Sequence, residues 1–328
     1  MNILIFSTVF YPGIGGIENQ TLLLAKEFVD KGHVVRVITH QMQVDALKGI
    51  EIYYRPGLIK SVKLFLWCTT YYMPNISLKG IWLLLLNPKK TWVISHNDFS
   101  SCNRKGVIPG LKNILHKFSS SNIAVSQSIA DYLGPSTAVI YNCYDDETFK
   151  IYAEEKRTYD FVFLGRLVSQ KGCDLLIKAC SGLQQPFTLG IIGTGPEEKY
   201  LKKLTTKLGL QDNVTFYGAL TGERLAKTLN RYRVMVVPSV LGEGFGMVVL
   251  EGLACGCKII AADAAGLAEA VGNYGSKFRM GDQIELSRLL EESIKNSQNN
   301  LQEDSNLQNH LKKHSKSVVA KSYLTFFT

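Results

Sequence analysis

The sequence predicts an α/β protein with two doubly wound domains, each a mostly parallel sheet covered by helices on both faces. The first reason is that apolar, strand-like runs alternate with segments of helical periodicity along the whole chain. The second is size: 328 residues exceed what one hydrophobic core usually organises, and 46% of them are hydrophobic, enough for two cores.

The first domain is expected over residues 1–150. It opens with a strand at 2–10, a glycine-containing loop, a helix at 17–32 and a second strand at 33–40. Its further expected strands are Trp92–Ser95, Asn122–Val125 and Ala138–Tyr141.

The second domain is expected over residues 151–310, after a joint near Asp145 to Thr158. Its expected strands are 160–165, 187–193, 214–218, 234–239 and 258–263, with helices beginning at Cys173, Glu197, Thr221 and close to Phe245. The polar stretch 298–309 is expected to be a surface linker or a helix cap. An amphipathic helix is expected in 311–328.

Composition limits the classes of partner and compartment. The net charge is +9 and the pI about 9.1, but residues 1–150 hold 15 basic and 10 acidic residues, so the excess is spread over both halves. The seven cysteines are odd in number and irregularly spaced, which favours reduced core thiols and a cytoplasmic protein. No leader is recognisable, and the most apolar run, 80–86, is too short to span a bilayer.

The residues that suggest chemistry follow the strands. In a parallel sheet of this kind, ligands bind beyond the carboxyl ends of the strands. The polar, charged and glycine residues found in such loops are Gly15, Gly16, His96, Ser126, Arg166, Gly193, Gly195 and the segment Glu243–Gly246.

Two cations share one of these loops. Arg166 and Lys171 lie five positions apart in "GRLVSQKG", and a forked guanidinium beside an ammonium suits a diphosphate. The alternative is an ordinary solvated basic loop. The turn that contains Gly193 and Gly195 either brings backbone close to a nucleotide or is a simple helix-opening turn.

The stretch "GEGFGMVVLEG" places Glu243 and Glu251 on either side of a glycine-rich helix start. Amides at that start can bind an anion, but carboxylates beside a phosphate would repel it. As acceptors from sugar hydroxyls the two acids are well suited, which indicates a nucleotide sugar. The alternative is a glycine corner with Glu243 solvated and Glu251 capping a neighbouring group.

Together these segments resemble the family-4 retaining glycosyltransferases of GT-B fold. The similarity rests on "PGIGGIE", "HND", "AVSQSI", "YNCYDDETF", "GRLVSQKG", "IIGTGP", "VTFYG" and above all "EGFGMVVLEGLACGCKII". It implies two Rossmann-like domains that face each other across a cleft, an acceptor-binding one and a nucleotide-sugar-binding one. It also implies that the terminal helix, 311–328, crosses back to the first domain.

The resemblance also implies roles for single residues. Glu251 is expected to accept from ribose hydroxyls and Glu243 from the transferred sugar, while Arg166 and Lys171 neutralise the diphosphate as the glycosidic bond breaks. His96 would lie over the donor sugar. The donor-binding backbone would come from Gly15 or Gly16, Gly193, Gly195, Gly244, Phe245 and Gly246, with Ser126 and Asn142 as further cleft residues.

The implied activity is transfer of a hexose from a nucleotide diphosphate sugar to a glycan or lipid-linked glycan, with retention of configuration. No metal and no further cofactor are expected, because the chain contains no Asp-x-Asp. The sequence departs from the family at Asn142-Cys143, where a glycine usually follows the asparagine, so that loop is expected to differ.

Membrane contact is a separate hypothesis. The segment 55–90 mixes aromatic residues, leucines and lysines, and the segment 103–118 is a candidate basic amphipathic helix. One or both could face an anionic membrane that holds a lipid-linked acceptor. The alternative is that they are core helices with solvated lysines.

Other functions remain open at this point. A nucleotide-sugar epimerase would use the same fold, whereas a phosphorylase is disfavoured because no lysine is set for a pyridoxal cofactor. A non-catalytic nucleic-acid-binding protein would fit the basic charge, but no nucleic-acid-binding module is recognisable. A non-catalytic binder of nucleotide sugars is disfavoured by the intact motifs.

Overall fold

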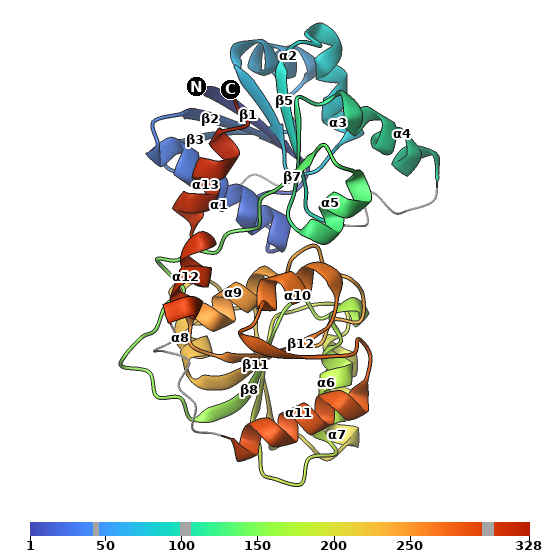
Figure 1. Ribbon diagram of the computed structural model, residues 1–328, viewed down its shortest axis with the longest axis vertical. Helices are drawn as coiled ribbons and strands as arrows, with labels where there is room; N and C mark the ends of the chain where they lie inside the picture. Colours follow the sequence, from blue (N-terminus) through green and yellow to red (C-terminus); the bar gives the residue numbers. More distant parts are fainter. Residues whose placement is uncertain (42–45, 99–105, 297–304) are drawn as a thin grey trace. The chain divides into compact units, whose positions relative to one another are not determined.

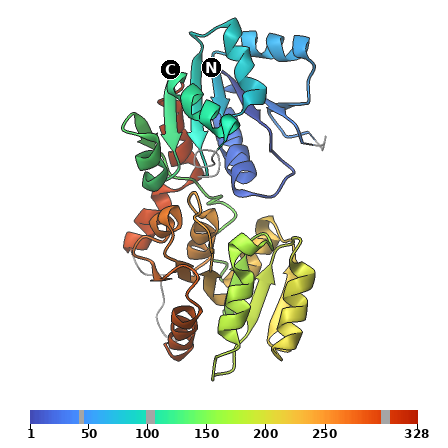
Figure 2. The ribbon, with the colours of Figure 1, turned by 90° about the vertical axis from the view of Figure 1, so that its right-hand side faces the viewer.

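A computed structural model describes residues 1–41, 46–98, 106–296 and 305–328. The chain forms two compact units: unit 1 contains Met1–Tyr144 and Lys313–Thr328, and unit 2 contains Asp145–Lys312. In each unit a parallel sheet lies between helices (Figures 1 and 2). The prediction of two doubly wound α/β domains is confirmed.

The sheet of unit 1 has seven parallel strands in the order β3-β2-β1-β4-β5-β6-β7. The strands are β1 Asn2–Ser7, β2 Val34–Thr39, β3 Ile50–Tyr54, β4 Thr70–Met73, β5 Thr91–His96, β6 Ser121–Ala124 and β7 Thr137–Val139. The helices are α1 Gly16–Asp30, α2 Leu58–Trp67, α3 Leu78–Ile81, η1 Trp82–Leu86, α4 Val107–Leu115, η3 His116–Phe118, α5 Gln127–Leu133 and α13 Lys316–Leu324.

The sheet of unit 2 has six parallel strands in the order β10-β9-β8-β11-β12-β13. The strands are β8 Tyr159–Leu164, β9 Leu189–Ile192, β10 Val214–Gly218, β11 Tyr232–Val237, β12 Lys258–Ala262 and β13 Gly275–Phe278. The helices are η4 Ser169–Lys171, α6 Cys173–Cys180, α7 Glu198–Lys207, α8 Gly222–Asn230, α9 Met247–Ala254, α10 Ala265–Val271, α11 Gln283–Lys295 and α12 Ser305–Lys313.

Strand β4 lies in the middle of the unit 1 sheet, between β1 and β5, although no strand was predicted there. Its four residues are all buried, so they lack the alternation that reveals a half-exposed strand. Tyr71 and Tyr72 are fully buried core residues. For these two aromatic residues of the segment 55–90, the core interpretation is therefore the correct one.

The carboxyl-terminal segment contains two helices where one was predicted. Helices α12 and α13 are separated at His314–Ser315, where Ser315 forms a parallel bridge with Tyr144. The backbone carbonyl of His314 accepts from the Tyr144 amide at 3.2 Å. The stretch 305–309, predicted as linker or cap, forms the first turns of α12, and residues 298–304 lie outside the described part of the chain.

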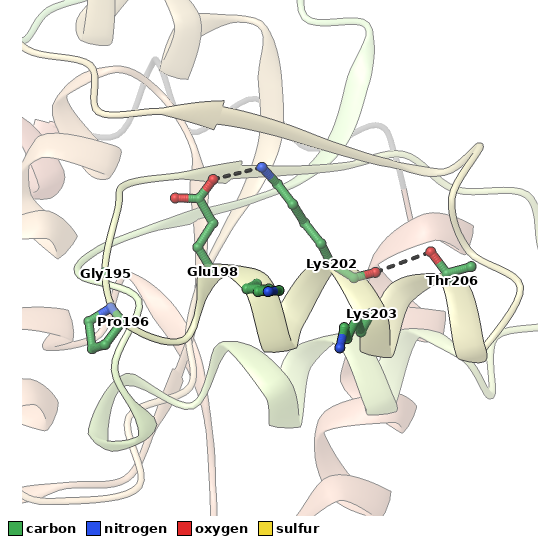
Figure 3. Close-up of a pocket in the computed structure, with 7 residues that line it drawn as sticks. Gly195, Pro196, Glu198, Lys202, Lys203 and Thr206 are labelled. Atoms are coloured by element: carbon green, nitrogen blue, oxygen red, sulfur yellow. Dashed lines mark hydrogen bonds and ion pairs between the residues drawn. The ribbon is translucent and has the colours of Figure 1, made fainter.

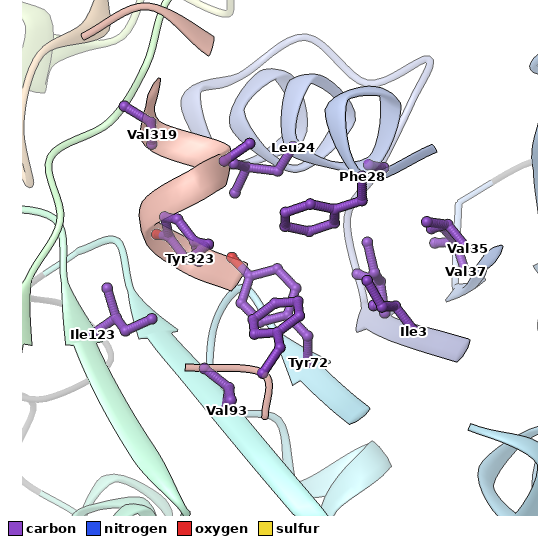
Figure 4. Close-up of a cluster of buried hydrophobic side chains, with 14 of the residues drawn as sticks. Ile3, Leu24, Phe28, Val35, Val37, Tyr72, Val93, Ile123, Val319 and Tyr323 are labelled. Carbon is purple, nitrogen blue, oxygen red and sulfur yellow. The ribbon is translucent and has the colours of Figure 1, made fainter. Parts of the chain in front are cut away.

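Helix α13 completes the hydrophobic core of unit 1 (Figure 4). Val319 and Tyr323 pack against α1 and the sheet together with Phe327, and all three side chains are buried. The ring of Phe327 lies 5.2 Å from that of Phe28 on α1 and 5.4 Å from that of Tyr72 on β4. A segment that follows unit 2 in sequence is thus a core element of unit 1.

The described cysteines are core residues, as predicted. Six cysteines are buried and form no disulfide, and Cys102 lies outside the described residues. Within the described ranges, no helix combines the length and the apolar character that crossing a bilayer requires.

We predict that Phe327→Ala lowers the free energy of unfolding by about 3–5 kcal/mol, because truncation removes buried ring contacts and leaves a cavity. Urea-induced unfolding followed by circular dichroism measures the change. Phe326→Ala is the matched control, because Phe326 is only partly buried at the edge of the same core. Equal losses in the two variants would contradict the core role of Phe327.

Candidate functional site

Three loops of unit 2 follow neighbouring strands and carry most of the predicted residues. They are residues 165–172 after β8, 193–197 after β9, and 238–246 after β11. Strand β8 lies between β9 and β11, and the strand order reverses between β8 and β11. Ligands of doubly wound sheets bind at this kind of switch point, beyond the carboxyl ends of the strands.

The loops after β8 and β9 pack backbone to backbone. The Leu167 amide donates to the Thr194 carbonyl at 2.9 Å. A Cβ atom on Gly193 would lie 1.9 Å from the Gly165 carbonyl oxygen, and one on Gly195 would lie 2.3 Å from the Leu167 carbonyl oxygen. Both positions therefore require glycine for the close approach of two loops, whatever they contact in a ligand.

Lys171 and Glu243 join the loops after β8 and β11. The Lys171 Nζ atom lies 2.9 Å from Glu243 Oε1, and the side chains are 30% and 13% exposed. The Ser239 hydroxyl donates to the same carboxylate oxygen, and Ser239 is fully buried. Two predicted residues are thus brought together, and Glu243 is held in one orientation.

Ser239 is a site residue that the sequence analysis missed. Its only sequence signal was its position, directly after a buried strand and one helical turn before an acid. The neighbouring Val240 amide donates to the Gln170 carbonyl at 3.0 Å, which holds the two loops together.

Glu251 is a buried carboxyl group in the second turn of α9. The residue is 7% exposed, and no described residue forms a hydrogen bond or an ion pair with its side chain. Burial raises the pKa of Glu251 to about 7, with the nearby Asp145 carboxylate as a further cause. A buried carboxyl group without a protein partner is energetically costly, so the site has acceptor capacity that a ligand can satisfy.

The segment Glu243–Gly246 leads into α9, which begins at Met247, two residues later than predicted. Gly246 is the N-cap residue with a left-handed backbone (φ 91°), and no side chain caps this helix end. Phe245 is buried and anchors the segment. The helix terminus therefore lies directly beside Glu243 in the chain, as the sequence predicted.

Arg166 is exposed, and within the described residues it forms no ion pair. Lys171, by contrast, is already paired with Glu243. The two cations predicted to act together thus differ in their surroundings in this structure. Among the described residues, no three His, Cys, Asp or Glu side chains are grouped so that they could hold a metal ion.

A hollow on unit 2 lies along the exposed side of α7 (Figure 3). Its lining includes a Glu198–Lys202 ion pair of 2.7 Å. The residues that line it are Gly195, Pro196, Glu198, Lys199, Lys202, Lys203 and Thr206. Gly195 alone is shared with the predicted site, so this hollow does not contain the Lys171–Glu243 pair.

In unit 1, Gly15 and Gly16 begin helix α1. Gly15 is the N-cap residue, and the Glu18 carboxylate folds back over it, so that a Cβ atom on Gly15 would lie 2.4 Å from Glu18 Oε2. Gly16 has open space at its Cβ position. An acidic side chain therefore lies close to the backbone that was predicted to face phosphate.

His96 ends strand β5 and is 1% exposed. Its Nε2 atom lies 2.9 Å from Asn122 Oδ1, and its ring meets the ring of His116 edge-on at 5.5 Å. Burial lowers the pKa of His96 to about 4, which leaves the imidazole neutral at physiological pH.

The two further predicted residues of unit 1 are also buried. The Ser126 hydroxyl accepts from the Ile129 amide at 3.3 Å and caps α5, which is a structural role. The Asn142 carbonyl lies 3.1 Å from His314 Nδ1, whereas Asn142 Oδ1 has no hydrogen-bond partner among the described residues. At position 143, the Cys143 amide donates to Gln20 Oε1 at 3.0 Å.

Comparison with known proteins identifies the family. The family model described as "Glycosyl transferases group 1" matches residues 145–317, more than half of the chain. The phosphatidylinositol N-acetylglucosaminyltransferase gpi3 subunit of Schizosaccharomyces pombe is 27% identical over 88% of this chain and 72% of its own length. An uncharacterized glycosyltransferase of Methanocaldococcus jannaschii is 37% identical over 34% of this chain and 28% of its own, so that match spans under a third of the relative.

Solved structures share the fold. Anabaena HepE, crystallised with UDP and glucose, superposes with a TM-score of 0.82 over 99% of this chain and 98% of its own, at 20% identity. The resemblance first drawn from the loop motifs is confirmed by the family match. The chain therefore belongs to the group 1 glycosyltransferases, enzymes that transfer a sugar, and has the two-domain GT-B fold.

Proposed function

We propose that this protein transfers a hexose from a nucleoside diphosphate sugar to a hydroxyl group of a glycan or lipid-linked glycan, with retention of configuration. The bond between the anomeric carbon and the diphosphate oxygen breaks, and a bond to the acceptor oxygen forms on the same face. The departing diphosphate takes the acceptor proton. The nucleoside diphosphate is the second product.

The observation that carries this proposal is the unpartnered carboxyl group of Glu251. Buried acceptors are normally hydrogen-bonded, and the hydroxyls of a ribose supply the donors that the protein does not. The Glu251 side chain lies in the second turn of α9, while the phosphates would lie at the start of that helix. This spacing separates the acid from the anion that would repel it.

The two cations of the loop 165–172 explain how the charge of the departing diphosphate is stabilised. When a diphosphate binds, Lys171 gains a second anion and shares its charge between the phosphate and Glu243. Arg166, which is exposed, supplies the forked donor that suits phosphate oxygens. Glu243, oriented by Ser239, is then placed to accept from hydroxyls of the transferred sugar.

The remaining roles follow from family resemblance. The glycine backbone of Gly15, Gly16, Gly193, Gly195 and of residues 244–246 would hold the donor, and neutral His96 would contact the transferred sugar. Ser126 and Asn142 would be further contacts. Stabilisation by cations and a helix terminus replaces a divalent metal in this scheme.

Relatives support the substrate classes. The Schizosaccharomyces pombe relative is named for transfer of N-acetylglucosamine to phosphatidylinositol, which favours a lipid-linked acceptor. The HepE structure contains UDP and glucose, which makes UDP-sugars the first donors to test. A cytoplasmic enzyme working at the inner face of the membrane would meet both substrates.

We predict that Arg166→Ala and Lys171→Ala each reduce turnover by roughly a hundredfold or more, because each removes charge that stabilises the departing diphosphate. The measurement is nucleoside diphosphate release from a panel of UDP-, GDP- and ADP-sugars, with the donor chosen by thermal shift. Glu243→Gln should also lose turnover, since an amide cannot replace the charge of the carboxylate.

Lys199→Ala is the matched control for this series, because it removes an exposed lysine of α7 from the same unit. Its rate should stay within about twofold of the parent rate. Addition of EDTA should have an equally small effect. Wild-type rates in Arg166→Ala and Lys171→Ala, or loss of activity in EDTA, would contradict the proposed electrostatic mechanism.

We also predict that affinity for a UDP-sugar rises with pH up to about 7. Ribose hydroxyls donate to the ionised form of Glu251, so binding below its pKa of about 7 must displace a proton. The dissociation constant should fall by roughly 25-fold between pH 5.5 and 7.5 and then level off. Titration calorimetry with an intact UDP-sugar avoids the terminal phosphate of UDP, which itself ionises near pH 6.

Glu251→Gln should remove most of this pH dependence. The control is Glu243→Gln, which should keep the pH dependence of UDP-sugar affinity because Glu251 is unchanged in that variant. Without ligand, Glu251→Gln should raise the melting temperature more at pH 8 than at pH 5, since an acid whose folded pKa is raised weakens the fold as pH increases. A flat pH profile in the parent protein would refute the assignment of Glu251.

A further inference from the structure

Helix α4 and the short helix η3 expose an apolar ridge on unit 1. None of the residues of α4 is buried. Among its side chains, Val107 is 89% exposed, and Phe118 of η3 is 73% exposed. We call the exposed set Val107, Ile108, Leu111, Ile114 and Phe118 the α4 ridge.

Most apolar side chains of α4 are exposed, and Leu115 at its last turn is the α4 residue that packs, partly buried, against the core of unit 1. Val107, Leu111 and Ile114 are spaced by four and three residues and therefore share one side of the helix. On the inner side His116 is buried, with its ring against that of His96 and its carbonyl accepting from Asn122 at 3.1 Å. An ordinary surface helix buries its apolar face, whereas α4 leaves most of its apolar residues exposed.

The charged residues of the segment 107–118 are two lysines, Lys112 and Lys117, and it contains no Asp or Glu. Of these, Lys117 is exposed and Lys112 is half-buried, and both lie within the ridge segment. An apolar helix face with basic residues along it is the composition of helices that lie in the interface of an anionic bilayer.

We propose that the α4 ridge is the membrane-docking surface of this enzyme and that it inserts into the headgroup region of anionic lipids. A stable contact with a second copy normally uses about 20–30 residues a side, whereas the ridge has five apolar residues on one short element. An interfacial helix needs only such a face, buried about 5–10 Å deep. The inference deepens the proposed function, because it would bring the enzyme to a lipid-linked acceptor.

Helix α2, on the same unit, is an internal control for the exposed apolar residues of α4. It also has exposed apolar residues, Leu58, Ile59 and Leu66, but it buries Leu64 and Phe65 in the core. Its exposed residues are therefore the remainder of an ordinary amphipathic helix. In α4, by contrast, no residue is fully buried, and Leu115 is only partly buried against the core.

The test is co-sedimentation of the full chain with vesicles of phosphatidylcholine alone or with about 30% phosphatidylglycerol, at low and high salt. We expect binding to the anionic vesicles that weakens at high salt. The ridge variant Leu111→Gln/Ile114→Gln/Phe118→Gln should bind at least about tenfold more weakly, and Lys112→Gln/Lys117→Gln about tenfold more weakly. The matched α2 variant Leu58→Gln/Ile59→Gln/Leu66→Gln should bind like the parent.

Several results of these experiments would overturn membrane docking by the α4 ridge. No binding by the parent protein, parental binding by the ridge variant, or loss confined to the α2 variant would each overturn the proposal. Sedimentation of the lipid-free parent as a dimer that the ridge variant abolishes would assign the ridge to a second copy instead. UDP-sugar titration of the ridge variant should match the parent, so failure of membrane docking is distinguishable from failure of the proposed transfer reaction.

A second measurement does not depend on loss of binding. In Phe118→Trp, the new indole should enter the interface, so vesicles with brominated lipid should quench its emission. The parent protein, which has three tryptophans, supplies the background signal. Quenching in Phe118→Trp no greater than in the parent would contradict insertion of the ridge.

Discussion

The candidate site of unit 2 depends on how closely two loops approach each other. The Pro238 carbonyl oxygen, after β11, lies 2.0 Å from where a Cβ atom on Gly172, after β8, would be. A side chain at that position would separate the loops, and with them Lys171 and Glu243, which are joined by an ion pair of 2.9 Å. The electrostatics of the site is therefore a consequence of backbone packing at the switch point of a parallel sheet.

Glu243 and Glu251 illustrate how two acids eight residues apart acquire different properties. Glu243 has a cation and a hydroxyl as partners, whereas Glu251 is buried with none among the described residues. The first is oriented by protein groups, and the second keeps acceptor capacity that none of the described residues uses. Such division of work is typical of sites in which positioning and recognition are assigned to separate groups.

Much of the fold was predictable because strongly periodic segments and glycine loops are local signals. Strand β10 was predicted with its bounds, 214–218, and parallel topology placed Lys171 and Glu243 in loops at the same end of the sheet, although their ion pair was not predicted. Strand β4 was not predictable, because four residues buried on both faces have no periodicity. Ser239 was missed for another reason: its hydrogen bond to Glu243 forms within a loop, where no periodicity predicts which way a side chain points.

The place of α13 has a consequence for the order of folding. Domains commonly fold in turn as the chain emerges during synthesis. Here Val319, Tyr323 and Phe327 belong to the core of unit 1 but follow the whole of unit 2 in the chain. Most of unit 1 is therefore synthesised before unit 2, but its core can be completed only after unit 2 has been synthesised. Until α13 packs in place, the apolar residues that it covers on α1 and the sheet stay accessible to chaperones.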